Sequence, residues 1–184
     1  MCSRNPLDCA PSFFFLVFAC THTETYVPCL LREDVAPTWK FFFKRAIDCW
    51  VHWHNYWLQQ ARSGKPIYFF RFEDMLTSPR QHLREMMAFM LGITEAEITG
   101  TVAERRIDEV LAMGTKSNQV YKPRQSGYNK NLIHYTPDMI EYVKEKAGDL
   151  LHFFGYADVD EALLPEERQS ICATPFFKVE STLQ

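Results

Sequence analysis

The chain has 184 residues, enough for one domain with a substantial core. Hydrophobic residues make up 47% of it and aromatic residues 15%, which argues against disorder over most of its length. The formal net charge of −3 gives no basic footprint, so nucleic acid is not expected as a partner. The six cysteines form no CxxC pair and show no metal-ligand spacing, which favours free thiols in a reducing compartment and predicts no metal site.

The first segment with recognisable chemistry is Arg4-Asn5-Pro6-Leu7-Asp8, with Ser12 eight residues after the arginine. Asp8 is predicted to cap a helix that runs through Phe13–Ala19, with Pro11 in its first turn. An arginine and a hydroxyl that bracket a helix start can hold a phosphate, because backbone N–H groups and the helix dipole also favour an anion there.

An alternative interpretation of the same segment is a short secretory signal, since an apolar run follows Arg4. Asp8, Pro6 and Pro11 fit a signal poorly, and the run is about half the roughly 20 residues that a membrane span needs. No membrane span is therefore predicted in this chain.

The middle of the chain predicts a helix followed by a strand. Residues 20–37 are expected to be irregular, and apolar residues then recur every three or four positions from Thr38 to Ala61, which is typical of a long amphipathic helix. After Ser63-Gly64-Lys65-Pro66, the run Ile67–Phe72 predicts a strand buried in a parallel sheet and ended by Glu73 and Asp74.

The remaining elements are predicted to be helices separated by loops. Ser78-Pro79 begins a helix that Gly92 ends, Thr94–Thr101 predicts a short helix, and residues 107–113 an amphipathic segment. Residues 114–135 are polar and loop-like, and Thr136-Pro137 begins a last helix that Gly155 ends. In the helix that Gly92 ends, the side chains expected to face inward are Leu83, Met86, Met87, Met90 and Leu91.

This order of elements predicts an α/β domain. It contains one recognisable central strand, and one strand cannot form a sheet. Either the partner strands are hidden in the sequence or part of the domain is missing, and we expect the second.

Several other residues invite a catalytic interpretation. Glu73 and Asp74 could act as general bases, although pairing with Arg71 or Arg80 is the expected role. His52 and His54 are two residues apart on a helix, so they point to different sides and form no metal pair. They are expected at the core or its rim, and the tryptophans of the same helix are expected in the core, namely Trp50, Trp53 and Trp57.

The polar loop contains a basic stretch, Lys116–Lys130, that carries no acidic residue. Its Lys122 and Arg124 could bind phosphate, and Gly127 would let the backbone approach a ligand closely. A solvated basic loop is the alternative, and charge alone favours that alternative.

Three segments in order resemble the sulfotransferases that use 3′-phosphoadenosine 5′-phosphosulfate (PAPS). Arg4-Asn5-Pro6-Leu7-Asp8 with Ser12 resembles their 3′-phosphate motif, and the stretch from Phe69 to Ile93 resembles their "YEDL…P…FLG" strand, turn and helix. The segment Lys122–Leu132 is similar to their late "RKGxxGDWKN" loop, and Gly155-Tyr156 ends the last helix as in many members. The resemblance spans about residues 4–156.

The resemblance implies a P-loop-NTPase-like α/β fold with a helix-rich C-terminal portion and an incomplete parallel sheet. It implies that Arg4 and Ser12 hold the 3′-phosphate of PAPS, or of its product 3′-phosphoadenosine 5′-phosphate (PAP), and that the sulfuryl group passes to a hydroxyl or amine. A basic residue of the late loop would reach the same phosphate. Arg124 is our choice for it, but alignment through Gly127 and Lys130 would select Lys122 instead.

Some family features differ or are absent. Phe72 stands where the family usually has tyrosine, and Tyr128-Asn129 replaces Asp-Trp. The family's phosphosulfate lysine and its histidine base precede the Arg-Asn-Pro segment, and only three residues precede Arg4 here. We therefore expect residues 1–157 to be a partial domain without that loop, with little or no activity and no assigned catalytic residue, and 158–184 to be a tail.

Two other functional classes stay open from the sequence: a nucleotide-binding remnant without transfer chemistry, and an α/β interaction domain whose motifs are coincidental. The acceptor and the oligomeric state are not specified. The cytoplasm is the expected compartment for this chain, with the Golgi as the alternative for a longer form.

Overall fold

The computed structural model describes residues 1–19, 30–115 and 131–156, and the chain divides into two compact units. Described residues 1–3 and 66–115 belong to the first unit, and residues 4–19, 30–65 and 131–156 belong to the second. Helices dominate both, and the described strands form one small parallel sheet, which is consistent with the predicted α/β class. No helix among the described residues is long and apolar enough to cross a membrane.

The second unit is built on helix α2 (Ala36–Arg62), which begins two residues before the predicted Thr38. Its buried residues recur at steps of three and four, as the sequence pattern requires for one apolar face: Trp39, Phe43, Ile47, Trp50, His54 and Leu58. Trp53 is 55% exposed, so the prediction that all three tryptophans lie in the core is wrong for Trp53. It follows Trp50 by three positions, but it falls outside the stripe that the other helices cover.

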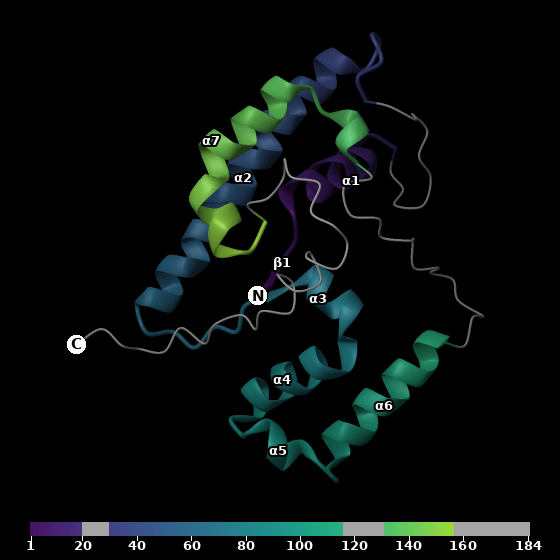
Figure 1. Ribbon diagram of the computed structural model, residues 1–184, viewed down its shortest axis with the longest axis vertical. Coiled ribbons are helices and arrows are strands. Elements are labelled where there is room, and N and C mark those ends of the chain that lie inside the picture. The colour runs from purple at the N-terminus through teal and green to yellow at the C-terminus, as the bar shows by residue number, and fades with distance from the viewer. Residues whose placement is uncertain (20–29, 116–130, 157–184) are drawn as a thin grey trace. The chain divides into compact units, whose positions relative to one another are not determined.

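Helix α7 (Pro137–Phe153) packs along α2, and Figure 1 shows the two side by side. Its buried face is the predicted one, with Met139, Val143, Ala147, Leu150 and Leu151. Gly155 has φ of 67°, in the left-handed region that glycine adopts without strain, so it ends the helix as predicted. The one-turn helix η1 (Leu132–His134) precedes α7 within the stretch that we predicted to be a loop.

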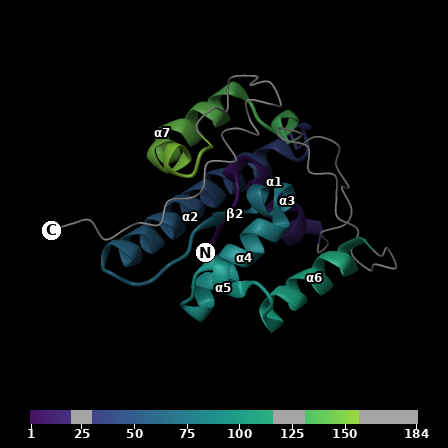
Figure 2. The same cartoon turned by 60° about the horizontal axis from the view of Figure 1, so that its bottom comes forward.

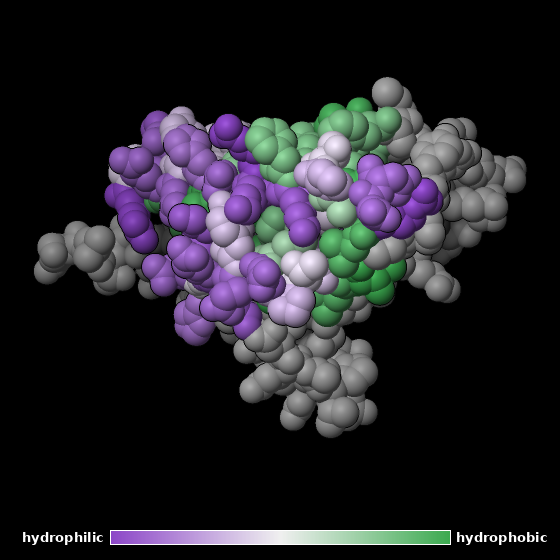
Figure 3. All heavy atoms as spheres, turned by 90° about the horizontal axis from the view of Figure 1, so that it is seen from above, coloured by the Kyte–Doolittle hydropathy of each residue, from purple (hydrophilic) through white to green (hydrophobic). Residues whose placement is uncertain are grey.

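Helix α1 (Pro6–Ala19) also packs on α2. Phe14 is buried and meets Trp39 edge to face, with ring centroids 5.4 Å apart. Phe13 and Phe18 also contact Phe42 of α2, with ring centroids 5.3 and 5.8 Å apart, although about half of each side chain stays exposed. Figure 3 shows that hydrophobic residues gather beside hydrophilic ones on one face of the molecule.

The sheet of the first unit joins β1 (Cys2–Ser3) to β2 (Phe70–Arg71) in parallel, with Cys2 opposite Phe70 and Ser3 opposite Arg71. A partner strand was therefore hidden in the sequence, because two residues give no periodic signal. The predicted strand Ile67–Phe72 is too long at both ends. Phe72 already begins helix α3 (Phe72–Thr77), so Glu73 and Asp74 lie in its first turn and not at a strand end.

Helices α4 (Pro79–Leu91), α5 (Glu95–Ile98) and α6 (Val102–Thr115) complete the first unit, and Figure 2 shows α5 between α4 and α6 along the chain. Gly92 ends α4 with φ of 67°, as predicted. Met90 and Leu91, predicted to face inward, are 61% and 53% exposed. The prediction is wrong there because α4 packs against α3, α5 and α6 over a narrower stripe than its apolar residues occupy.

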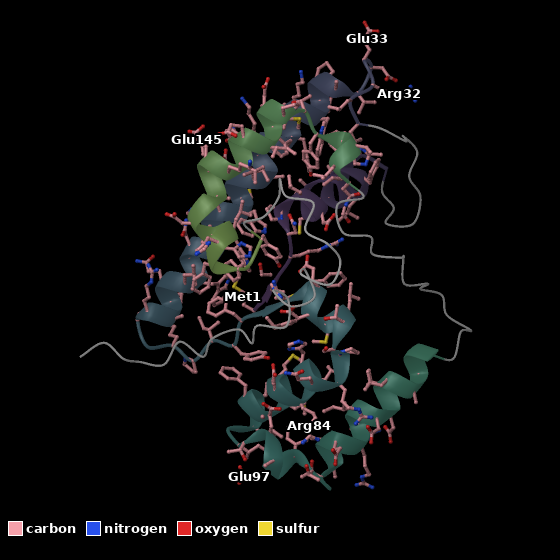
Figure 4. All side chains as sticks on the ribbon, in the orientation of Figure 1. Met1, Arg32, Glu33, Arg84, Glu97 and Glu145 are labelled. Carbon is pink, nitrogen blue, oxygen red and sulfur yellow. The ribbon has the colours of Figure 1, made fainter. Side chains whose placement is uncertain are left out.

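Charged side chains hold α4 to its neighbours in the first unit. Arg84, labelled in Figure 4, donates to the Glu104 carboxylate at 2.5 Å and to the Glu95 carbonyl at 2.7 Å. The other oxygen of Glu104 accepts the Gly100 N–H at 2.7 Å. One arginine thus joins α4 to both α5 and α6.

Candidate functional site

The phosphate-binding segment predicted from the sequence begins with Arg4, directly before the first turn of α1. Asn5 is the residue that caps this helix, since its side-chain oxygen accepts the Leu7 N–H at 2.9 Å and its carbonyl accepts the Cys9 N–H at 3.0 Å. The prediction that Asp8 is the cap is therefore wrong by three residues. Pro6 occupies the first helical position, where its missing N–H costs nothing, and this explains why the helix begins so early.

The backbone of Arg4 is held by helix α2. The Trp50 indole N–H donates to the Arg4 carbonyl at 3.0 Å, and Trp50 itself is buried. The Cys9 thiol, one turn into α1, approaches the same carbonyl at 3.8 Å. The side chain of Arg4 is half-buried. Its main chain is therefore fixed by a contact 46 residues away in the sequence.

Pro11 lies inside α1, beyond the first turn in which we expected it. Proline has no N–H, so the Leu7 carbonyl one turn earlier loses its helical partner. The Tyr135 hydroxyl supplies the missing donor at 2.7 Å. Burial raises the pKa of Tyr135 well above its ordinary value, with Asp8 and Cys9 acting in the same direction, so the hydroxyl keeps its proton and donates.

Asp8 and Ser12 are four residues apart on α1, so they lie one turn apart on the same helix face. Both are half-buried. The Asp8 carboxylate accepts a hydrogen bond from the Asn131 side-chain amide at 2.6 Å. Asn131 is the last residue but one of the Lys122–Leu132 segment that resembles the late sulfotransferase loop, and nothing in the sequence marked it as a contact of α1.

Lys122, Arg124 and Gly127 lie outside the described residues. The predicted link between this loop and the α1 site therefore stays a prediction for these residues. Among the predicted cofactor contacts, the described ones are Arg4 and Ser12.

Of the Glu73-Asp74 pair, Asp74 takes the structural role that we expected. Asp74 is buried, and its carboxylate accepts from the Arg71 guanidinium at 2.8 and 2.5 Å. The two side chains are only 2% and 3% exposed. Removing either partner of such a buried pair is destabilising, because it leaves the other as a buried charge without compensation. The carboxylate of Asp74 is engaged by this pair, which does not support its use as a general base.

The two histidines of α2 point to different sides, as predicted. His52 is exposed, whereas His54 is buried and its ring stacks on Trp50 with centroids 3.8 Å apart. His54 Nδ1 lies 2.7 Å from the Trp50 carbonyl, which only accepts, so this nitrogen carries the proton. Burial lowers the pKa of His54 and favours the neutral ring. Within the described residues, no cluster of three or more metal-ligating side chains occurs.

The comparison with protein families decides what this arrangement belongs to. The sulfotransferase domain family matches residues 1–131, more than two thirds of the chain. The chain belongs to the sulfotransferase-domain family. No curated protein and no solved structure gives a match. Membership indicates a transferase that moves a sulfuryl group, and with it a nucleotide cosubstrate and an acceptor.

The matched range of the sulfotransferase domain ends at Asn131, the residue that contacts Asp8. It includes all of α1 and every predicted cofactor residue. The helix α7 lies beyond it, although the sequence resemblance extended to Tyr156. The observed architecture is a small parallel sheet with helix-rich units, and a P-loop-like fold is implied by the family alone.

Proposed function

We propose that this sulfotransferase domain binds PAPS, or its product PAP, with the 3′-phosphate held by Arg4, directly before α1, and by Ser12 in the second turn of α1. The sulfuryl group would pass to a hydroxyl or amine acceptor. The sequence resemblance adds Arg124 or Lys122, with Gly127, as further contacts of the same phosphate. The observation that carries the proposal is the family match, which covers both Arg4, directly before the anchored start of α1, and Ser12 in its second turn.

The chemistry of the helix start supports this assignment. A phosphate is stabilised at a helix N-terminus by backbone N–H groups and by the helix dipole. Arg4 directly precedes the Asn5 cap, and the Trp50 bond fixes its backbone. An arginine whose backbone is held in this way offers a fork of donors to a phosphate without first having to order its main chain.

Titration calorimetry with PAP and with 5′-AMP tests the proposal, because the two nucleotides differ at the 3′-phosphate. The full chain should bind PAP more tightly. Arg4→Ala should weaken PAP binding by about 10- to 100-fold, since a hydrogen bond to a charged group contributes about 1.5–3 kcal/mol. Arg45→Ala is the matched control, because Arg45 is an exposed arginine of α2 in the same unit.

Equal affinity for PAP and 5′-AMP would contradict recognition of the 3′-phosphate. Equal losses in Arg4→Ala and Arg45→Ala would indicate a general effect of charge instead of a contact at Arg4. Either result would contradict the assignment of the 3′-phosphate site to Arg4 and Ser12, but it would not affect the family membership.

One observation favours a second candidate function, nucleotide binding without transfer. Of the four candidate bases that the sequence singled out, two are engaged elsewhere: Asp74 pairs with Arg71, and His54 is buried and bonded to a carbonyl. We therefore expect little or no transfer by residues 1–184. Transfer of labelled sulfate from PAPS to a panel of hydroxyl and amine acceptors, well above a heat-inactivated control, would overturn this second candidate.

A further inference from the structure

Two side chains from the segment before α7 reach the first turns of α1. The Asn131 amide donates to Asp8 at 2.6 Å, and the Tyr135 hydroxyl donates to the Leu7 carbonyl at 2.7 Å. The partners are 123 and 128 residues apart in sequence, so these contacts are purely tertiary. Together they hold two consecutive residues of α1 from one side.

The two bonds differ in what they replace. Tyr135 satisfies the carbonyl that Pro11 leaves without a helical donor, so its bond is explained by the helix itself. Asp8 needs no such partner, because a carboxylate in the first turn of a helix is already favoured by the helix dipole. The Asn131–Asp8 bond is therefore not required by the secondary structure of α1.

We propose that Asn131 and Asp8 are positioning residues for the phosphate site, an inference that rests on the proposed function. Ser12 lies one turn from Asp8 on the same face of α1, so fixing Asp8 sets the rotation of that face and with it the Ser12 hydroxyl. Asn131 also directly follows Lys130, the last residue of the basic stretch. The bond thus ties the residue that directly follows the basic stretch to the helix that carries Ser12.

The physical gain is preorganisation. A hydroxyl or guanidinium that is already in place when the anion arrives loses little conformational freedom on binding, whereas a helix start that can rotate must be ordered first. The expected consequence of losing the Asn131–Asp8 bond is weaker nucleotide binding with the fold retained. A merely structural bond would lower stability and leave the affinity unchanged.

Calorimetry with PAP on four variants of the full chain tests the inference. Asn131→Ala should weaken PAP binding about 5- to 10-fold, and Asn131→Asp should weaken it more because two carboxylates then face each other. The double variant Asp8→Asn with Asn131→Asp should restore most of the loss, since the amide at position 8 can donate to the carboxylate at 131. Tyr142→Phe is the control, because it removes an exposed 3.0 Å bond to Asp48 in the same unit.

Far-UV circular dichroism of each variant checks that it folds. Affinities of both Asn131 variants equal to that of the unchanged chain, which itself binds PAP, would overturn this inference alone. A double variant that binds PAP no more tightly than Asn131→Asp would overturn the inference as well. It would mean that restoring a bond between positions 8 and 131 does not restore the affinity. Absence of PAP binding by the unchanged chain would overturn the proposed function and this inference with it.

Discussion

The two units differ in the kind of contact that stabilises each of them internally. In the second unit, aromatic side chains from α1, α2 and the segment around η1 pack on one another, and three of them donate hydrogen bonds to distant carbonyls. These three bonds run from Trp39 to His134, from Trp50 to Arg4, and from Tyr135 to Leu7. In the first unit, charged side chains perform most of the joining, as Arg71 does with Asp74 and Arg84 with Glu104.

The burial of apolar residues follows the same division. Within the described residues, the buried hydrophobic side chains of the first unit are Phe69, Ala88, Ile98 and Ile107, and all the others belong to the second unit. Buried apolar area is the main favourable term in folding, whereas exposed ion pairs contribute little. The unit with Arg4 and Ser12 therefore has the larger apolar core of the two.

The largest expected effect is on the aromatic core of the second unit. Phe43→Ala should lower the free energy of unfolding by about 3–5 kcal/mol, because Phe43 is 1% exposed and packs on Trp39 and Tyr135. Phe41→Ala, two residues away and 69% exposed, should change it by about 0.5 kcal/mol or less. Urea unfolding measures both, and similar losses would contradict the division between covered and uncovered faces of α2.

The next effect tests the charged contacts of the first unit. Arg71→Met keeps most of the side-chain volume but leaves Asp74 buried without its cation, which should cost about 3 kcal/mol. The matched control is Arg80→Met, whose pair with Asp108 is about half exposed and should contribute less than about 1 kcal/mol. A small loss in Arg71→Met would mean that this unit does not depend on its buried pair.

A smaller effect is expected where an aromatic residue supplies one hydrogen bond. Tyr135→Phe should lower the free energy of unfolding by about 1–3 kcal/mol. The buried Leu7 carbonyl then loses the Tyr135 hydroxyl, and Pro11 has no N–H to replace it. Tyr142→Phe removes an exposed hydroxyl contact and should cost less. Equal midpoints in thermal unfolding for the two variants would show that the Leu7 carbonyl finds another donor.

The smallest effect is a pH dependence that belongs to the second unit. Burial lowers the pKa of both His54 and His134 below the ordinary 6.5, so the unfolded chain binds more protons than the folded chain as the pH falls below that value. Stability is then complete above about pH 6.5 and falls as the solution is acidified towards the folded pKa. Protonation would also abolish the acceptor role of His134 Nδ1 towards the Leu30 N–H, a 3.2 Å bond.

The variant His54→Gln with His134→Asn should reduce this acid dependence of the urea midpoint between pH 7.5 and 5. Asparagine at 134 can still accept the Leu30 N–H through its side-chain oxygen, so the comparison isolates the titration. An unchanged dependence in the double variant would mean that other groups cause the loss of stability in acid.

Much of the helical structure and the family could be read from the sequence. The apolar spacing of α2 and α7 predicted their buried faces, and Gly92 and Gly155 marked the ends of two helices. The family followed from three segments in order. The short partner strand Cys2–Ser3 could not be predicted, because strand periodicity needs more than two residues.

The contacts around the predicted site could not be predicted, for a comparable reason. Arg4 and Ser12 were proposed from their chemistry and spacing, but the bonds to the Arg4 carbonyl and to Asp8 come from Trp50 and Asn131, which are distant in sequence. One signal was present: a proline inside a helix frees the carbonyl four residues earlier, and that carbonyl must then find a donor. The position of Pro11 in the helix could therefore have indicated a contact at Leu7, but not that Tyr135 makes it.

The sequence by itself determined the helices, their apolar faces and the sulfotransferase family, because backbone geometry and local side-chain chemistry repeat at short, fixed spacings. The tertiary structure alone decided which donors reach α1, that Asn5 and not Asp8 caps it, and that Trp53, Met90 and Leu91 stay exposed. Such outcomes depend on which surfaces meet in the folded chain. That is a property of the packing as a whole, and no local spacing encodes it.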